Sequence, residues 1–266
     1  MALSKFCKKI GPDPASIKSC MIGGIVANNA SGMCCGVDQN SYKTLKNMKI
    51  ILQDGTRLDT SNEVSRNKFL KTHHQFCEKL LRLRDKILKD EKLVKLIKRK
   101  YKIKNTCGYS INALIDFDNP ADILLHLMIG SEGTLGFIEE VTYDTVEDLP
   151  FKAISLMLFK DIKTAANAVQ RLKKIPRSEV PAAELMNRAS LRSIQNKQGL
   201  EFLKSLDEKV AALLVETRST QKSDLQLQMN KIINILKGLP TIKPIVFSDD
   251  VKIYQKYWNI RKGLFP

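Results

Sequence analysis

Residues 21–32 read MIGGIVANNASG. The stretch joins small and carboxamide side chains to two apolar residues, and it contains neither charge nor bulk. A core strand would carry more β-branched and aromatic residues, and a flexible linker would not contain Ile25 and Val26. We therefore expect a segment whose backbone must come close to another group.

A second small-residue cluster, GSEGTLG, occupies residues 130–136. It is not a G-x-G-x-x-G motif, and the apolar helix predicted at 121–130 precedes it, which disfavours a Rossmann nucleotide site. No G-x-x-x-x-G-K-[ST] motif is present, so a P-loop is excluded. Glycines permit positive φ, which we expect at Gly24 and Gly133, and they leave amide groups free to hold an anion. The spacing fits two walls of one cleft for a phosphorylated cofactor, or two ordinary glycine-rich turns.

Length and composition limit which classes of protein this chain can belong to. The chain has 266 residues, of which 43% are hydrophobic, enough for one large domain or two smaller ones. It contains no run of 18 apolar residues and no signal-peptide pattern at its N-terminus. Six cysteines without a C-x-x-C pair indicate reduced thiols in a cytoplasm, and they argue against a zinc or iron–sulfur site within this chain.

The formal net charge of +16 is concentrated in one segment. Residues 62–104 hold 15 Lys or Arg and 5 Asp or Glu, and their apolar residues recur at helical spacing. We interpret the segment as a basic helical insertion with a solvated lysine face. Few aromatic residues interleave with the basic ones, so no nucleic-acid partner is expected. A surface for nucleic acid or an anionic membrane remains the alternative.

The remaining pattern predicts an α+β fold. A strand at 46–53 enters an Asp54-Gly55 turn, and a return strand begins at 56–58. Past residue 150 we expect a strand at 153–159, helices at 161–173 and 182–194, a strand at 211–216 and a helix at 223–237. This β-α-α-β-α order predicts a second domain. We place the first domain at residues 1–148 and the second at residues 149–266.

Three stretches carry a resemblance to a known family: GPDPASIKSCMIGGIVANNASGMCCG (11–36), NSYKTLKNMKIILQDGTRLDT (40–60) and HLMIGSEGTLGFIEEVTY (126–143). They resemble the FAD-linked oxidases, which include D-lactate dehydrogenases and related D-2-hydroxyacid dehydrogenases. Within that family the chain is most similar to large bacterial proteins that join a flavin module to an iron–sulfur module. Residues 182–194 and 257–266 look like the family's substrate-side cap.

The resemblance implies a fold and a set of cofactor contacts. Residues 1–148 would be the second subdomain of a PCMH-type FAD-binding module, with the insertion at 62–104, and residues 149–266 a partial ferredoxin-like cap. The implied FAD-binding residues are Gly23, Gly24, Ala27, Asn28, Asn29, Gly32, Gly130, Ser131, Glu132, Gly133, Thr134, Gly136 and Ile138. Because a substrate carboxylate needs a cation, Arg261 is the first candidate for it and Lys262 the second.

The implied activity is oxidation of a D-2-hydroxy acid, of the D-lactate or D-2-hydroxyglutarate class, to the 2-oxo acid. Hydride would pass to flavin, and electrons would leave through an iron–sulfur module outside this chain, in the cytoplasm or at the inner face of the membrane. The family's pyrophosphate loop and histidine-rich segment are missing here, and His126 has the setting of a core residue. We therefore expect an interior fragment that is inactive alone; a non-catalytic chain without cofactor is the alternative.

Overall fold

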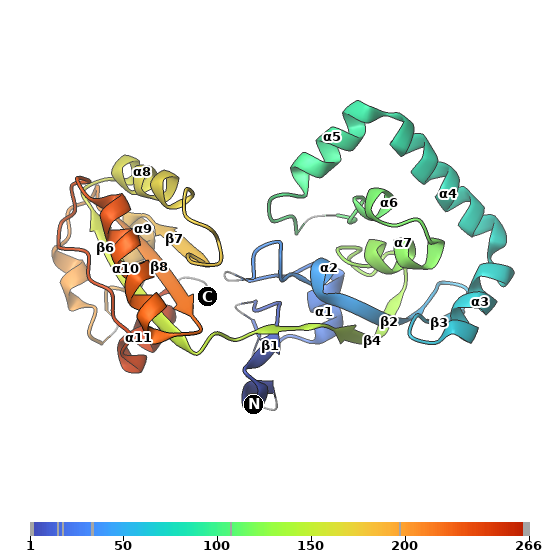
Figure 1. The fold of residues 1–266 in the computed structure, drawn as a ribbon, viewed down its shortest axis with the longest axis horizontal. Coiled ribbons are helices and arrows are strands. Elements are labelled where there is room, and N and C mark those ends of the chain that lie inside the picture. Colours follow the sequence, from blue (N-terminus) through green and yellow to red (C-terminus); the bar gives the residue numbers. More distant parts are fainter. Residues whose placement is uncertain are drawn as a thin grey trace. The chain divides into compact units, whose positions relative to one another are not determined.

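The computed structural model describes residues 3–14, 16–17, 19–32, 35–106, 108–196 and 198–262, with side chains up to residue 259. The chain divides into two compact units, Met1–Glu147 and Asp148–Pro266 (Figure 1). Both units combine helices with antiparallel sheet, so the predicted α+β class is confirmed.

Unit 1 is built around a three-stranded antiparallel sheet with the order β3-β2-β4. A separate ladder pairs β1 with β5. The elements in chain order are η1 (Leu3–Phe6), β1 (Lys8–Ile10), α1 (Ile22–Ala27), α2 (Ser41–Thr44), β2 (Leu45–Ile51), β3 (Arg57–Asp59), α3 (Glu63–Thr72), α4 (His74–Lys89), α5 (Glu91–Lys100), α6 (Ala113–Asp116), α7 (Pro120–Leu127), β4 (Phe137–Tyr143) and β5 (Thr145–Glu147).

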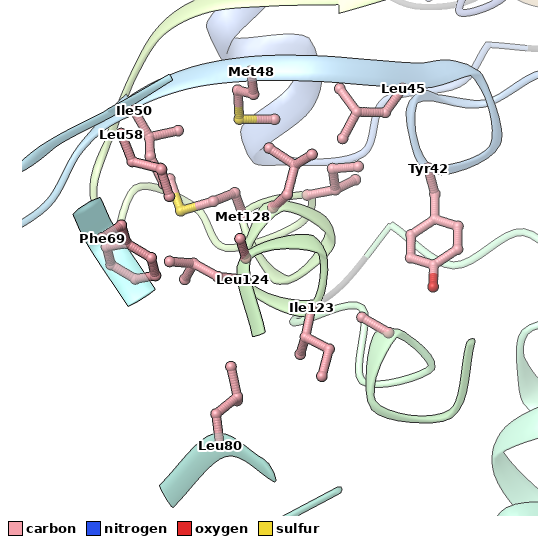
Figure 2. Close-up of a cluster of buried hydrophobic side chains, with 14 of the residues drawn as sticks. Tyr42, Leu45, Met48, Ile50, Leu58, Phe69, Leu80, Ile123, Leu124 and Met128 are labelled. Carbon is pink, nitrogen blue, oxygen red and sulfur yellow. The ribbon is translucent and has the colours of Figure 1, made fainter. Parts of the chain in front are cut away.

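The core of unit 1 lies between β2 and α7 (Figure 2). Met48 and Ile50 are two apart on β2 and therefore share one face of the sheet, where both are buried. Ile123, Leu124 and Met128, from α7 and the residue after it, fill the opposite side of this core. The packing holds the GSEGTLG segment, which begins three residues after the end of α7, against the sheet.

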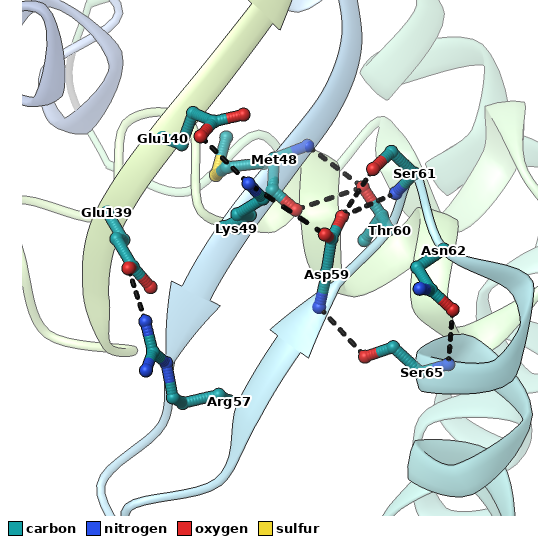
Figure 3. A network of polar contacts seen from close by, with 10 residues as sticks. All are labelled: Met48, Lys49, Arg57, Asp59, Thr60, Ser61, Asn62, Ser65, Glu139 and Glu140. Atoms are coloured by element: carbon teal, nitrogen blue, oxygen red, sulfur yellow. Dashed lines mark hydrogen bonds and ion pairs between the residues drawn. The ribbon is translucent and has the colours of Figure 1, made fainter.

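Ion pairs connect the three strands on the outer face of the sheet (Figure 3). Lys49 on β2 lies 2.9 Å from Glu140 on β4, and Arg57 on β3 pairs with Glu139 on β4. These side chains are partly or largely exposed, so solvent screens each pair and its contribution to stability is small. Their main effect is to favour one register, because opposite charges face each other only in that register.

The basic segment at 62–104 forms three helices, α3, α4 and α5, on the outside of unit 1 (Figure 1). The Asn62 side chain accepts a hydrogen bond from Ser65 N–H and caps α3, and Asp90 caps α5 in the same way. Each helix turns part of its apolar face inward. The buried residues on these helices are Phe69, Cys77, Leu80 and Ile97.

His126 on α7 is a core residue, as its sequence setting indicated. It is 6% exposed, its Nδ1 lies 2.8 Å from the Asp122 carbonyl oxygen, and its ring stacks on Phe117 at 3.9 Å between centroids. Burial lowers the pKa of His126 below its ordinary value of 6.5.

We expect this histidine to make unit 1 sensitive to mild acid. Below pH 6.5 the unfolded chain binds a proton at His126 that the folded chain does not, so stability falls as the pH decreases through that value. His126→Phe should flatten this part of the pH profile. Hydrogen exchange of α7 amides between pH 7 and about 5 measures the effect, and an unchanged slope in the variant would contradict it.

Unit 2 contains a three-stranded antiparallel sheet with the order β6-β8-β7. Helices α8 and α10 pack on one face of it around Met157, Leu213 and Val215. The elements are β6 (Phe151–Phe159), α8 (Ile162–Leu172), β7 (Ala182–Met186), α9 (Arg188–Ile194), η2 (Glu201–Ser205), β8 (Ala211–Ser219), α10 (Lys222–Leu236) and α11 (Val251–Lys262).

The predicted helix at 182–194 is wrong in its first half. Residues Ala182–Met186 form β7, paired with β8, and only Arg188–Ile194 is helical. Ala, Glu, Leu and Met favour helices, but pairing with β8, which is buried over most of its length, outweighs that local preference. Asn187 then caps α9 by accepting a hydrogen bond from Ser190 N–H. From β6 to α10 the order of strands and α-helices is therefore β-α-β-α-β-α instead of β-α-α-β-α.

Candidate cofactor site

The first glycine segment is a short helix that ends in a left-handed turn. Sequence reasoning did not predict α1. Asn29 has φ 49°, its N–H donates to the Val26 carbonyl oxygen, and the Ala30 N–H donates to that of Ile25. This is the Schellman arrangement, with Asn in the position that usually holds Gly. The Asn28 side chain accepts a further bond from Ala30 N–H.

The second glycine segment is a turn bonded directly to the end of α1. Gly130 N–H donates to the Val26 carbonyl oxygen at 3.0 Å, and Glu132 N–H donates to that of Ala27 at 2.8 Å. Thr134 closes the turn through bonds from its N–H and its hydroxyl to the Ser131 carbonyl oxygen. Although they are far apart in sequence, the two segments are thus held together in unit 1 by hydrogen bonds between their backbones.

The glycines in these segments have two different roles. At Gly32 and Gly130, a Cβ atom would lie 2.1 Å and 2.5 Å from the carbonyl oxygens of Asp13 and Gly108, so backbone packing requires glycine. At Gly24 and Gly133, no described heavy atom lies within 4 Å of the Cβ position, apart from the residue itself, its chain neighbours and the nearby backbone of α1. These two glycines border space that the described residues leave open.

The expectation of positive φ is correct at Gly133, where φ is +78°, and wrong at Gly24, which lies inside α1. Helical φ suits any L-residue, so backbone strain does not explain Gly24. The remaining members of the predicted set lie beside these glycines. A Cβ at Gly23 would lie 3.6 Å from the Ile138 carbonyl oxygen, and one at Gly136 would lie 2.7 Å from that of Ile51.

Three buried polar atoms at the joined segments have no hydrogen-bond partner among the described residues. They are Asn29 Oδ1, Ser31 Oγ and Ser131 Oγ, on side chains that are 2–6% exposed. An unsatisfied buried polar group costs about 1–3 kcal/mol, and a ligand that supplied donors or acceptors would remove that cost. Small residues, open space and unmatched polar atoms together fit a polar cofactor such as FAD.

Sequence reasoning missed a third segment, which closes over the first two. Asn29 Nδ2 donates to the Asn105 carbonyl oxygen at 3.0 Å, and Lys104 Nζ donates to that of Gly32 at 2.8 Å. The Tyr109 hydroxyl lies 2.8 Å from Thr134 Oγ1. The signal was the run of small and polar residues after α5, in which Gly108 has φ +75°. The end of the insertion at residues 62–104 therefore contacts the site through Lys104.

The predicted substrate cations lie in the other unit of the chain. Arg261 and Lys262 belong to the last turn of α11, in unit 2, and their side chains lie outside the described residues. No group of three or more His, Cys, Asp or Glu side chains among the described residues is placed to hold a metal ion. Within the same residues, no helix has the length and apolar character needed to cross a membrane.

Comparison with known families assigns both parts of the chain. The model described as "FAD binding domain" matches residues 1–61, and the model described as "FAD linked oxidases, C-terminal domain" matches residues 150–266. Both models describe domains of FAD-linked oxidases, and the cofactor that they indicate for this chain is FAD. The resemblance and the cofactor inferred from the sequence are confirmed.

The curated relatives that match this chain share only about a quarter of their aligned residues with it. A mitochondrial D-2-hydroxyglutarate dehydrogenase of Arabidopsis thaliana is 26% identical over 149 residues, which are 55% of this chain and 26% of that protein. The glycolate oxidase subunit GlcD of Escherichia coli K12 is 26% identical over 256 residues, 96% of this chain and 40% of that protein. The chain thus spans less than half the length of either relative.

Solved structures support the fold. Two structures of alkyldihydroxyacetonephosphate synthase superimpose with TM-scores of 0.58 and 0.56 at 14% and 15% identity. The superpositions cover 98% and 99% of this chain, and 42% and 39% of the two synthase chains. At this level of identity the similarity concerns the fold alone.

Proposed function

We propose that this chain forms the FAD-binding part of an enzyme that oxidises a D-2-hydroxy acid to the 2-oxo acid. The observation that carries the proposal is the joined pair of glycine segments, held by Gly130 N–H and Glu132 N–H, with open space beside Gly24 and Gly133. Both curated relatives are named for small 2-hydroxy acids, which supports the substrate class.

In this proposal the chain binds and orients, and the cofactor supplies the redox chemistry: FAD, when bound, accepts a hydride. Gly24 and Gly133 let the cofactor approach the backbone. Asn29 Oδ1, Ser31 Oγ and Ser131 Oγ, which are buried without a hydrogen-bond partner among the described residues, would bond to its polar groups. Because the backbone bonds fix both segments before the cofactor arrives, little ordering is needed on binding.

The substrate carboxylate would be held by Arg261, with Lys262 as the second candidate. A guanidinium forms two parallel hydrogen bonds to a carboxylate and fixes its direction, which an ammonium group does not. We further propose that residues 1–148 are part of a PCMH-type FAD-binding domain and residues 149–266 part of the substrate cap. The electron acceptor would be reached through an iron–sulfur module on another polypeptide segment or protein.

Reduction of bound flavin tests the substrate class. The full-length protein in which we expect this chain to lie is loaded with FAD and mixed without oxygen with D-lactate, D-2-hydroxyglutarate or glycolate, and with the L-acids as controls. We expect the visible flavin bands to bleach with a D-acid, and an artificial dye to be reduced in its presence. Bleaching by L-acids alone would contradict the proposed substrate, and absence of FAD binding would contradict the proposed site.

Arg261→Lys separates the carboxylate role from a structural one. It keeps the charge but removes the paired hydrogen bonds, so we expect the substrate concentration for half-maximal bleaching to rise about tenfold or more, with FAD affinity unchanged. Equal effects on FAD and on substrate would point to a structural role for Arg261.

A further inference from the structure

The outer faces of α4 and α5 repeat one arrangement of side chains. In α4, Lys79, Arg82 and Lys86 surround Leu83, and in α5, Lys92, Lys95 and Arg99 surround Leu96 in the same way. The basic residues stand at i, i+3 and i+7 and the leucine at i+4, so each group of four shares one side of its helix.

Both groups are exposed. Leu83 is 47% and Leu96 41% exposed, and all six basic residues are exposed. The inward stripes, with Leu80 on α4 and Ile97 on α5, are buried and satisfy the packing needs of these helices. The outward leucines therefore have no role in the core of unit 1.

The positive charge on these faces is largely uncompensated. Arg82 pairs with Glu78 at 3.4 Å and Lys95 with Glu91 at 3.6 Å, both in exposed i,i+4 pairs. Lys79, Lys86, Lys92 and Arg99 have no carboxylate within 4.0 Å among the described residues. An anionic partner would supply the missing counter-charges.

We propose that the outer faces of α4 and α5 bind the headgroup region of an anionic lipid bilayer. Leucine amid lysine on an amphipathic helix suits the boundary between headgroups and acyl chains, where lysine stems lie along apolar surface while their ammonium groups reach lipid phosphates. Cations near such a surface strengthen binding by attraction to anionic lipids. This inference stands independently of the proposed substrate.

A nucleic acid fits these faces less well. Single strands bind through aromatic side chains that stack on bases. Of the aromatic residues here, Phe69 is buried and the Tyr101 hydroxyl is held by the Tyr109 carbonyl oxygen and Ile111 N–H, which leaves Phe76, 42% exposed. Lysine also outnumbers arginine in the residues 62–104. Arginine is the side chain that binds a phosphate through two parallel hydrogen bonds, so this composition does not favour nucleic acid.

Vesicle sedimentation tests the proposal. The protein is mixed with vesicles of phosphatidylcholine alone or of phosphatidylcholine with phosphatidylglycerol, at low and physiological salt. We expect binding to the anionic vesicles only, weakened by salt. The combined change Lys79→Gln, Lys86→Gln, Lys92→Gln and Arg99→Gln should reduce the partition coefficient about 100- to 1000-fold, since each cation contributes about fivefold.

The matched control carries Lys163→Gln, Lys204→Gln, Lys209→Gln and Lys237→Gln, all exposed in unit 2, and should bind nearly as the unmodified protein does. Leu83→Ser with Leu96→Ser should weaken binding about tenfold or more if the leucines enter the interface. Circular dichroism confirms that each variant is folded. Equal loss in both sets of lysine variants, or no binding to anionic vesicles, would overturn the proposal. Tighter binding to duplex DNA than to vesicles, lost in the α4–α5 variant, would identify a nucleic-acid surface instead.

Discussion

Gly133→Ala should weaken FAD binding about tenfold or more, whereas Gly238→Ala should leave it unchanged. The two glycines form a matched pair, because φ is +78° at Gly133 and +83° at Gly238, and no described heavy atom lies within 4 Å of either Cβ position. An alanine at positive φ costs about 1–2 kcal/mol at both sites. Any difference in FAD affinity therefore reflects what occupies the open space beside Gly133.

Gly24→Ala provides the complementary experiment. Gly24 lies inside α1, where alanine is favoured over glycine by about 1 kcal/mol, so the variant should be slightly more stable than the unmodified protein. If the cofactor approaches the backbone there, its methyl group should still reduce FAD affinity. Titration of FAD by flavin fluorescence, with thermal unfolding alongside, measures both quantities. Unchanged affinity in Gly24→Ala and Gly133→Ala would show that the cofactor lies elsewhere.

The sequence identified the two glycine segments because their composition is unusual in either a strand or a linker. It could not show that they are bonded to each other. That contact depends on the left-handed turn at Asn29, and a left-handed asparagine has no distinctive sequence pattern. The positive φ expected at Gly24 failed for a related reason: glycine permits many conformations, and the open space beside it is visible only in three dimensions.

Long-range pairing accounts for the other differences. Residues Ala182–Met186 have helix-forming side chains, and their conversion to β7 is decided by β8, almost thirty residues further on. The contacts of Lys104 and Tyr109 with the site follow from the way that α5 returns the chain to the core. By contrast, the Asp54-Gly55 hairpin and the helices of the insertion are local patterns, and the structure has them where the sequence indicated.

Arg218→Met should destabilise unit 2 by about 3–5 kcal/mol, because it leaves a buried carboxylate without its cation. Glu216 on β8 is fully buried; one of its oxygens accepts a bond from Arg218 Nε and the other from the Tyr254 hydroxyl at 2.7 Å. Tyr254 lies on α11 and is itself largely buried. Its pKa lies above the ordinary value, and burial is the main cause. The cluster thus ties α11 to the central strand of the sheet.

The same change should alter the proposed substrate site, since α11 also carries Arg261 and Lys262. Trp258 is the only tryptophan of the chain, lies on α11 and is 9% exposed, so its fluorescence during chemical denaturation reports on unit 2. Glu216→Gln combined with Arg218→Met removes both charges while keeping an amide oxygen for Tyr254, and it should restore most of the lost stability. If the double variant were as unstable as Arg218→Met alone, packing of the arginine stem would be the cause and the charge pair would not. If Arg218→Met left the transition unchanged, the Glu216 carboxylate would have another source of compensation, and the cluster would not anchor α11.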